Sequence, residues 1–453
     1  MTRQLQPPTR ERRLGALSAY LGDVGSLIAE FEAGPPVTRI RTFSQVAVDD
    51  VSAALQVLTE TDGLGIIVHG ARGCAGALAA AEADRPWAVT NLDQRDTILG
   101  ADGTLARTLR QLHLRHRPWA IVVVATPVVA INNDDIQSVA EELSDELGIP
   151  IIELRTDGFR SRVAATGLDI AAQAIATLVP PGGARQRDVI NLLALERGPG
   201  LAGVVQAIES LGLAVNLFPV GAGPATFARA AQAVLSVAVF EDETDALRRE
   251  LDRLHGVPFL RLPPPIGAAA TQRFVAAIAA ATERTAPAPV ADTHDVRILN
   301  GRSVVVALPP SSALAVAELV DRFGGELVGL SVDWVDSLHL DGLRTIGTAH
   351  PELPLHVAAG QPFELVNWLG RIAPDLVIGT PATAATAARA GIAAVAVGAD
   401  DLLGASGETR LGSRIQRLLD GQALKQRLAA PAASYLAGWM KRSPDWHIKR
   451  EVR

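Results

Sequence analysis

Short runs of Val, Ile and Leu alternate with alanine-rich segments of helical period along most of this 453-residue chain. Such runs are typical of strands buried on both faces of a parallel sheet, and the segments between them are long enough for crossover helices. The sequence therefore predicts an α/β protein made of three doubly wound, Rossmann-like parallel sheets. The predicted strands are residues 64–68, 120–124 and 151–154 in the first set, residues 189–195, 214–218, 235–240 and 258–262 in the second, and residues 303–308, 326–330, 353–357, 376–379 and 394–397 in the third.

Breaks that contain two prolines each separate these sets, one at residues 180–183 and another, expected to be a linker, at residues 285–292. A domain of about 150 residues for each set is ordinary. Residues 14–31 have a helical pattern and are expected to lie outside the sheets, whereas the end of the chain is expected to pack on another domain or subunit. The predicted division is an N-terminal arm or helix at 1–37, α/β domains at 38–185, 186–290 and 291–425, and a tail at 426–453.

The net charge, the apolar runs and the cysteine content of the sequence limit which partners and which compartment can be expected. The net charge of -7 gives no overall attraction to a phosphate backbone, and no basic stripe interleaved with aromatic residues is present, so no nucleic acid is expected. No apolar run reaches the ~18 residues that a membrane-spanning helix needs, so no membrane is expected either. One cysteine cannot form an internal disulfide, and we expect a cytoplasmic protein.

Cys74, the single cysteine, lies in the loop after the predicted strand 64–68, where residues 69–76 read His-Gly-Ala-Arg-Gly-Cys-Ala-Gly. Open parallel sheets bind ligands beyond the carboxyl ends of their strands, so this loop is a candidate site. The thiolate is expected in the first turn of an alanine-rich helix, where the helix dipole lowers the pKa of a thiol. On these grounds alone Cys74 could be a packing residue, a nucleophile or one ligand of a metal cluster.

Two other loops follow predicted strands. Residues 125–136 contain Thr126 and end with Asp134 and Asp135, which we expect to be charges at a helix N-terminus rather than catalytic acids. Residues 197–203 match the Gly-x-Gly-x-x-Gly pattern of dinucleotide-binding loops, but the next strand ends without the acidic residue that binds ribose. We expect these glycines to serve a tight turn and close helix packing. No P-loop pattern occurs, so the chain is expected to have no ATP site of its own.

The order of these motifs resembles the nitrogenase component 1 superfamily. The loop at 69–76, the segments at 90–93 and 99–102, the run at 118–136 and the segment at 151–159 follow one another as that family's motifs do. The resemblance covers roughly residues 38–420 and is strongest to β-type subunits, above all to the cysteine-poor β-like subunit of the cofactor-assembly scaffold. It implies the three-domain fold of component 1.

The cysteine positions depart from the family pattern. Residues 42–50 hold no cysteine, and Thr126 stands where the family's Thr-Cys-Pro loop has one. Because an iron-sulfur cluster usually needs four thiolates, the resemblance implies a [4Fe-4S] cluster at a subunit interface, with Cys74 as one ligand and three ligands from the partner. Any larger iron-sulfur cofactor would be held mainly by the partner.

The other residues of the expected cluster site follow from the same resemblance. Gly73, His69, Arg72 and Thr126 are expected to line the cluster. His69 could equally be a structural residue, and Arg72 could equally belong to a surface ion pair.

The resemblance leaves two functions open. In the first, the chain is the β-type subunit of a nitrogenase-like reductase that forms an α2β2 heterotetramer with an α-type subunit. A separate ATP-hydrolysing iron protein would deliver electrons to the interface cluster, and from there to a substrate site mainly in the α-type partner. In the second, the chain is the β-like half of a scaffold that holds and matures an iron-sulfur cofactor precursor. The arm and the tail favour the reductase, and an NAD-dependent α/β enzyme is a weaker third alternative.

Overall fold

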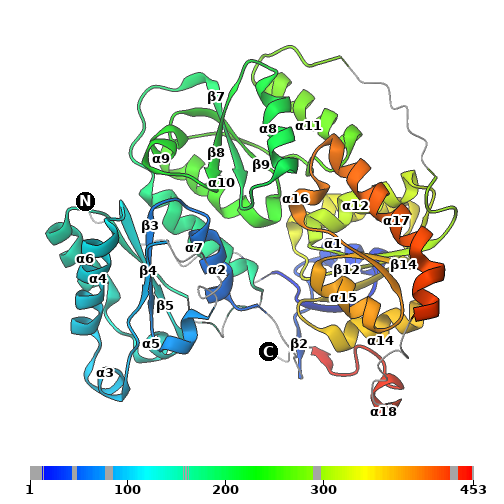
Figure 1. Cartoon of the computed structure of the whole chain (residues 1–453), viewed down its shortest axis with the longest axis horizontal. Helices are drawn as coiled ribbons and strands as arrows, with labels where there is room; N and C mark the ends of the chain where they lie inside the picture. Colours follow the sequence, from blue (N-terminus) through cyan, green and yellow to red (C-terminus); the bar gives the residue numbers. More distant parts are fainter. Residues whose placement is uncertain are drawn as a thin grey trace.

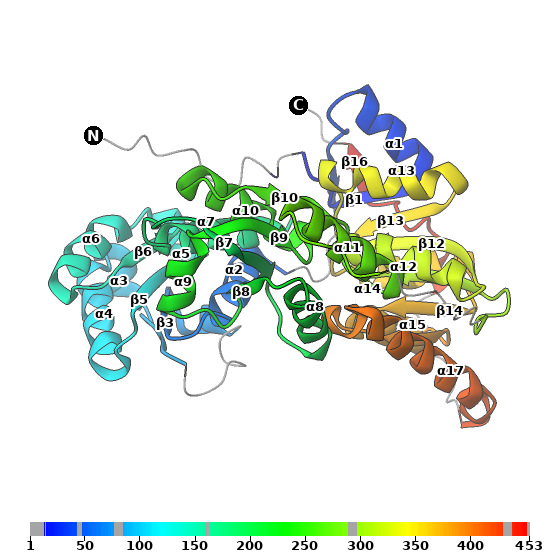
Figure 2. The same ribbon diagram turned by 90° about the horizontal axis from the view of Figure 1, so that it is seen from above.

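The computed structural model describes residues 13, 15–42, 48–76, 85–156, 158, 161, 163–288, 297–428 and 437–450. Three sheets, each with helices packed against it, succeed one another along the molecule (Figures 1 and 2). The strands within each sheet are parallel, apart from one added edge strand, which confirms the predicted α/β class. None of the helices in the described part is long and apolar enough to cross a membrane.

The first sheet has the strand order β4-β3-β5-β6. Every residue of its two central strands, β3 and β5, is buried, as their unbroken apolar sequences predict. The chain runs from β3 to β4 on one side and to β5 and β6 on the other, so the topological switch point lies between β3 and β5. The elements are β3 (Leu64–His69), β4 (Trp87–Val89), β5 (Ala120–Ala125) and β6 (Ile151–Leu154), with helices α2 (Asp50–Thr59), α3 (Gln94–Leu99), α4 (Asp102–His116), α5 (Pro127–Asn132), α6 (Ile136–Leu147) and α7 (Ala165–Leu178).

The second sheet has the order β10-β9-β7-β8, so its switch point lies between β7 and β9. Helix α10 of this domain packs on α7 of the first, and the buried side chains of the two domains form one continuous apolar cluster. The elements are β7 (Gln186–Ala194), β8 (Ala214–Pro219), β9 (Ala233–Ala238) and β10 (Phe259–Leu260), with helices α8 (Pro199–Glu209), α9 (Pro224–Ala230), α10 (Glu241–His255) and α11 (Ala268–Ala281).

The third sheet has the order β1-β13-β12-β11-β14-β15. Its strands are β1 (Ala19–Asp23), β11 (Ser303–Ala307), β12 (Glu326–Val332), β13 (Pro354–Ala358), β14 (Leu376–Gly379) and β15 (Ala393–Ala396). Its helices are α1 (Val24–Ala33), α12 (Pro310–Arg322), α13 (Leu340–Ala349), α14 (Pro362–Ile372), α15 (Pro381–Arg389), α16 (Ala399–Leu402) and α17 (Ala405–Leu428), with a 3-10 turn η3 (Ser337–His339).

The region expected as a helix outside the sheets is divided between a strand and a helix. Residues 19–23 form β1, which pairs antiparallel with β13 at the edge of the third sheet, and only α1 is helical. The expectation that residues 14–31 form a helix or arm outside the sheets is therefore wrong for residues 19–23. Alternate residues of β1 do not follow a clear apolar pattern, because Gly22 and Asp23 interrupt it.

The end of the chain packs back on the third domain. Helix α18 (Ala437–Met440) is followed by β16 (Ile448–Arg450), which pairs antiparallel with β2 (Arg39–Arg41). Just before β16, His447 Nε2 lies 2.5 Å from Glu364 Oε1, and the same oxygen accepts a 2.7 Å hydrogen bond from Arg41 Nε. These described tail residues are thus held by buried polar bonds to the chain itself.

Arg13 joins all three domains. Its guanidinium donates to Asp169 of α7 at 2.6 and 2.9 Å, to Asp336 beyond β12 at 2.9 Å, and to the backbone carbonyl of Asp242 in α10 at 3.3 Å. The group also lies 4.5 Å from the centre of the Trp334 ring. Because Arg13 is only 4% exposed, these bonds are needed to compensate its lost hydration.

Candidate functional site

Cys74 lies on a short turn at the carboxyl end of β3. The turn is the 3-10 helix η2 (Arg72–Ala75), and its Cys74 N–H donates to the Ala71 carbonyl at 3.0 Å. Cys74 is partly exposed and packs against the apolar cluster of the first two domains, whereas the next residue, Ala75, is buried. The expectation that Cys74 lies in the first turn of an α-helix is therefore wrong, because the residue lies in a tighter 3-10 turn. The alanine-rich segment at 77–84, where that helix was expected, lies outside the described residues.

No described residue fills the space beside Gly73, the residue before Cys74. Gly73 is exposed, and a Cβ atom added to it would meet nothing within 4 Å. Arg72, on the other side of Gly73, is exposed as well. The three predicted residues 72–74 thus form a partly exposed rim at the switch point of the first sheet.

Two buried threonines hold the Cys74 loop by hydrogen bonds to its backbone. Thr126, at the carboxyl end of β5, donates from Oγ1 to the His69 carbonyl at 2.7 Å. Thr90, at the carboxyl end of β4, accepts the Gly70 N–H at 2.9 Å. Gly70 permits this close approach, because a Cβ there would lie 2.1 Å from Thr126 Oγ1. The structure therefore places Thr126 beneath the loop, as a group that fixes it.

His69 is buried between Thr90 and Asp134. A hydrogen bond of 3.1 Å links His69 Nδ1 to Thr90 Oγ1, and His69 Nε2 lies 3.5 Å from Asp134 Oδ2. Burial lowers the pKa of His69 to about 4 and raises the pKa of Asp134. Both shifts favour the uncharged forms, so at neutral pH His69 adds no charge to the loop.

The two adjacent aspartates have different tasks. Asp135 is the N-cap of α6 and accepts the Ser138 N–H at 3.1 Å, as the sequence predicts. Asp134 instead turns toward His69, and its Oδ2 has no hydrogen-bond partner among the described groups. The expectation that both are helix charges is thus wrong for Asp134.

An exposed apolar patch flanks the Cys74 loop. We call Ile98 and Leu99 of α3 and Val128 and Ile131 of α5 the apolar patch; all four are exposed. The two helices follow β4 and β5, the neighbours of β3, and Asn132 Nδ2 of α5 donates to the Thr97 carbonyl of α3 at 3.2 Å. Both helices lie beyond the first sheet in Figure 1. The sequence reasoning missed this patch, although large apolar residues in short helices after strands were its signal.

The described residues can supply one ligand of a metal cluster but not a complete set of ligands. Among them, no group of three or more His, Cys, Asp or Glu side chains is placed to hold a metal ion. Cys74 is the only cysteine of the sequence. A thiolate on an open turn can ligate iron, so a cluster at this site would need its remaining ligands from another chain.

The second glycine-rich loop is closed by the chain itself. Gly200 N–H and Leu201 N–H, at the start of α8, donate to the two carboxylate oxygens of Asp400 at 3.0 and 2.7 Å. A Cβ on Gly198 would lie 2.1 Å from Asp400 Oδ2, and one on Gly200 would lie 2.0 Å from the Asp400 carbonyl. These glycines allow α16 to pack on α8, and a carboxylate fills the place where a dinucleotide would put its pyrophosphate.

Comparisons with known proteins agree with the fold. A light-independent protochlorophyllide reductase chain from Methylobacterium sp. (strain 4-46) is 28% identical over 306 residues, which cover 61% of this chain and 59% of that protein. Its counterpart from Rhodospirillum rubrum is 28% identical over 362 residues, covering 67% of this chain and 64% of the relative. Both relatives are named as one subunit of that reductase. The matches to these two relatives thus span less than two thirds of their length.

A solved structure and a family profile cover more of the chain. The structure described as nitrogenase Cp1 at pH 6.5 superposes with a TM-score of 0.71 over 88% of this chain and 98% of that chain, at 16% identity. This likeness concerns the fold. The profile of the family described as "Nitrogenase component 1 type Oxidoreductase" matches residues 51–402, from α2 to α16. The chain therefore belongs to the nitrogenase component 1 type oxidoreductase family.

Proposed function

We propose that this chain is the β-type subunit of a nitrogenase-like reductase, and that Cys74 supplies one ligand of an iron-sulfur cluster shared with an α-type subunit. The observation that carries the proposal is the setting of Cys74: a lone, partly exposed cysteine on the turn after β3, at the switch point of the first sheet. Four thiolates usually hold a [4Fe-4S] cluster, so three would come from the partner. Any larger iron-sulfur cofactor would belong mainly to that partner.

The residues around Cys74 have separate tasks in this proposal. Gly73 leaves room beside the thiolate, and Arg72 offers a positive charge to an anionic group. Thr126 and Thr90 fix the loop by hydrogen bonds, while His69 is neutral and adds no charge of its own. The bound cluster would accept and release single electrons.

Electrons enter, in our proposal, from a separate iron protein that hydrolyses ATP, because this chain has no P-loop. The apolar patch supports this, since exposed apolar side chains gathered at one place mark protein contacts. The iron protein would dock on the Cys74 side of an α2β2 heterotetramer, and the substrate site would lie mainly in the α-type partner. We place this assembly in the cytoplasm, where a single free thiol is usual.

The alternatives are weaker. A cofactor-assembly scaffold would share the fold and the cluster position, but the relatives reported above are named as reductase subunits. Those names make protochlorophyllide the first substrate to test. An NAD-dependent enzyme would need a free α8 N-terminus, which Asp400 occupies.

Replacement of Cys74 by Ala tests the cluster ligand. The chain should be purified with its α-type partner, and iron content and the electron paramagnetic resonance spectrum should be measured before and after the change. We expect the substitution to abolish or alter the cluster signal and to lower turnover at least ~100-fold, as removal of a group required for the chemistry does, while thermal unfolding changes little.

Leu114→Ala, at an exposed position of α4, is the control, because it changes neither the proposed ligand nor the groups that fix the Cys74 loop. It should keep the signal. Unchanged iron content, spectrum and activity in Cys74→Ala would show that Cys74 is a packing residue.

The docking surface is tested by Leu99→Asp. Leu99 is 82% exposed in the apolar patch, and Leu114 of α4 is 72% exposed outside it, so Leu114→Asp is a matched control. We expect Leu99→Asp to slow reduction by the iron protein at least ~10-fold, because a charge opposes burial of this surface. Reduction of the cluster by dithionite should stay the same. Equal effects of the two substitutions would remove the patch from the proposal.

A further inference from the structure

We infer that a second site, a cavity between the second and third domains, binds a small apolar molecule that carries one anionic group such as a carboxylate. The cavity has a volume of about 400 Å³, within the ~300–1,000 Å³ typical of small-molecule sites. The residues that line it all lie at or beyond Glu241 in the chain, so the cavity is separate from the Cys74 loop.

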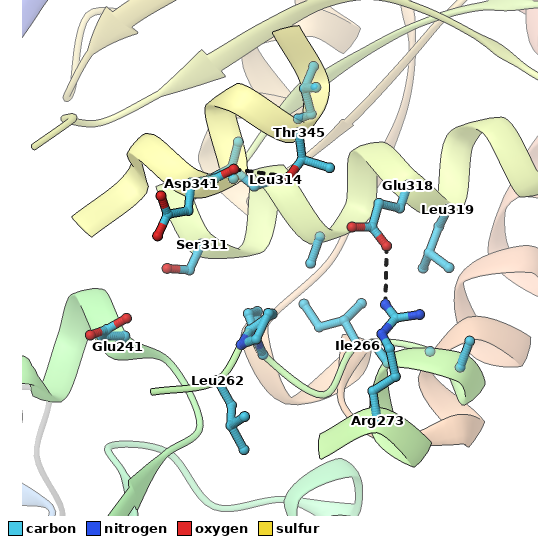
Figure 3. Close-up of a pocket in the computed structure, with 18 of the residues that line it drawn as sticks. Glu241, Leu262, Ile266, Arg273, Ser311, Leu314, Glu318, Leu319, Asp341 and Thr345 are labelled. Carbon is cyan, nitrogen blue, oxygen red and sulfur yellow. Dashed lines mark hydrogen bonds and ion pairs between the residues drawn. The ribbon is translucent and has the colours of Figure 1, made fainter. Parts of the chain in front are cut away.

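The position of the cavity is one that α/β sheets commonly use. Its walls are formed by the segments that follow β9 and β10 in the second sheet and β11 and β12 in the third. The carboxyl ends of two sheets therefore open toward the same space, and such ends are where ligands bind in this class of fold. Figure 3 shows the two walls, with α12 and α13 above and the segment from Leu262 to α11 below.

The lining is suited to an apolar body. Leucine and isoleucine side chains come from both walls, and small residues between them leave the space open: Leu262, Ile266, Leu314, Leu319, Ala270 and Ala315. Side chains of this kind line small-molecule sites and exclude water from the bound surface.

The charged groups at the cavity favour an anion. Three ion pairs lie along it: Arg261 with Glu241, Arg273 with Glu318, and Arg322 with Glu408. In each pair the arginine side chain is the more exposed member: 48% against 15%, 64% against 55%, and 27% against 13%. In each pair the guanidinium is therefore the group more accessible to an incoming anionic group. The remaining lining carboxylate, Asp341, pairs with Arg344.

Arg273 is the arginine best placed to receive the anionic group. It comes from α11 and reaches Glu318 on α12 across the cavity, with 3.4 Å between Nη2 and Oε2 (Figure 3). Both side chains are more than half exposed, and ion pairs of that kind contribute little. A ligand carboxylate can therefore replace Glu318 and use both arms of the guanidinium fork. Arg261 is fixed by two bonds to Glu241, 2.6 and 3.2 Å long, and is less free to turn.

Two matched dyes test the site in the full-length chain. 8-Anilinonaphthalene-1-sulfonate has an apolar body with one anionic group, and N-phenyl-1-naphthylamine has the same body without it. Fluorescence titrations should show tighter binding of the anionic dye. Arg273→Gln should weaken the anionic dye about fivefold and leave the neutral dye unchanged, whereas Glu318→Gln, which releases Arg273, should tighten the anionic dye about twofold.

A variant that fills the cavity separates it from other apolar surfaces. Ala270→Phe combined with Ala315→Phe adds one ring from each wall and should weaken the anionic dye at least ~10-fold. Ala385→Phe, on the exposed face of α15, is the control, and thermal unfolding checks that both proteins fold. Unchanged dye binding in the filled variant overturns the site. Equal responses of both dyes to Arg273→Gln, or weaker binding in Glu318→Gln, overturn its preference for an anion. The assay needs neither iron nor a partner, so its outcome is independent of the proposed reductase function.

Discussion

The two glycine-rich loops of this chain look alike in sequence and differ in structure. Each follows a buried parallel strand, and each lies at the switch point of its sheet. At Gly73 a Cβ atom would meet nothing within 4 Å, whereas at Gly200 it would lie 2.0 Å from the Asp400 carbonyl. No described residue fills the space beside Gly73 in the first loop, whereas the chain's own third domain fills the second loop. A glycine pattern alone therefore does not indicate a ligand site. Whether the loop has room for a ligand depends on which atoms of the chain lie opposite the glycine.

Gly200→Ala should have the largest effect on stability. The added methyl group would overlap backbone, which cannot move away as a flexible side chain can, so we expect a loss of about 3 kcal/mol in the free energy of unfolding. Urea unfolding of the purified chain measures it. Gly203→Ala, in the same helix, has nothing within 4 Å of its new Cβ and should instead stabilise the chain by ~0.5–1 kcal/mol. Similar values for the two variants would contradict the packing role of the second loop.

Acid should weaken the first loop through His69. Burial holds the pKa of folded His69 at about 4, below its ordinary value of 6.5. Between pH 6.5 and about 4, His69 binds a proton in the unfolded chain but not in the folded chain. The contribution of neutral His69 to the free energy of unfolding is therefore complete above pH 6.5 and is lost as the pH falls toward 4. We expect His69 to account for a loss of about 2 kcal/mol between pH 6.5 and 5.

The measurement is urea unfolding at pH 5 and pH 7 of the wild type and of His69→Gln. The variant should lose this part of the pH dependence, although it is less stable at pH 7 because a buried bond to Thr90 is disturbed. His350→Gln, at an exposed histidine, should leave the pH dependence as it is. An unchanged slope in His69→Gln would mean that folding does not shift the pKa of His69.

Gly73→Ala should have the smallest effect on stability and the clearest effect on the site. Because the new methyl group meets no atom of the described residues within 4 Å, the free energy of unfolding should change by less than ~0.5 kcal/mol. In the complex with the α-type partner, the same methyl group would occupy space beside the Cys74 thiolate and should lower the iron content. If iron content is unchanged, the open space at Gly73 is not used by the cluster.

The strands were the part of the fold that the sequence predicted best. Central strands such as β5 and β14 consist almost entirely of Val, Ile, Leu and Ala, and such a sequence predicts a strand that is buried on both faces. Among the strands that escaped prediction are β1 and β4. β4 has only three residues, and β1 joins its sheet as an antiparallel edge with a sequence that lacks a strand pattern.

The sequence predicted the site residues only where they lie close together in the chain. Cys74 and its neighbours could be found because they lie in one loop after a recognisable strand. The carboxylate of Asp400 could not be assigned to α8, since the two lie 200 positions apart and nothing nearby marks the pairing. The approach of Asp134 to His69 was within reach, because both belong to loops at the carboxyl ends of adjacent strands.

The bonds of Arg13 have a consequence for the order in which the molecule is built. Its three partners lie 156, 229 and 323 positions later in the chain. At the ~5–20 residues per second of protein synthesis, the last of them leaves the ribosome on the order of tens of seconds after Arg13. Local contacts within each sheet can form during that time, but the junction of the three domains cannot. Docking of the domains around Arg13 is therefore a late, long-range step, and contacts of such high sequence separation slow folding.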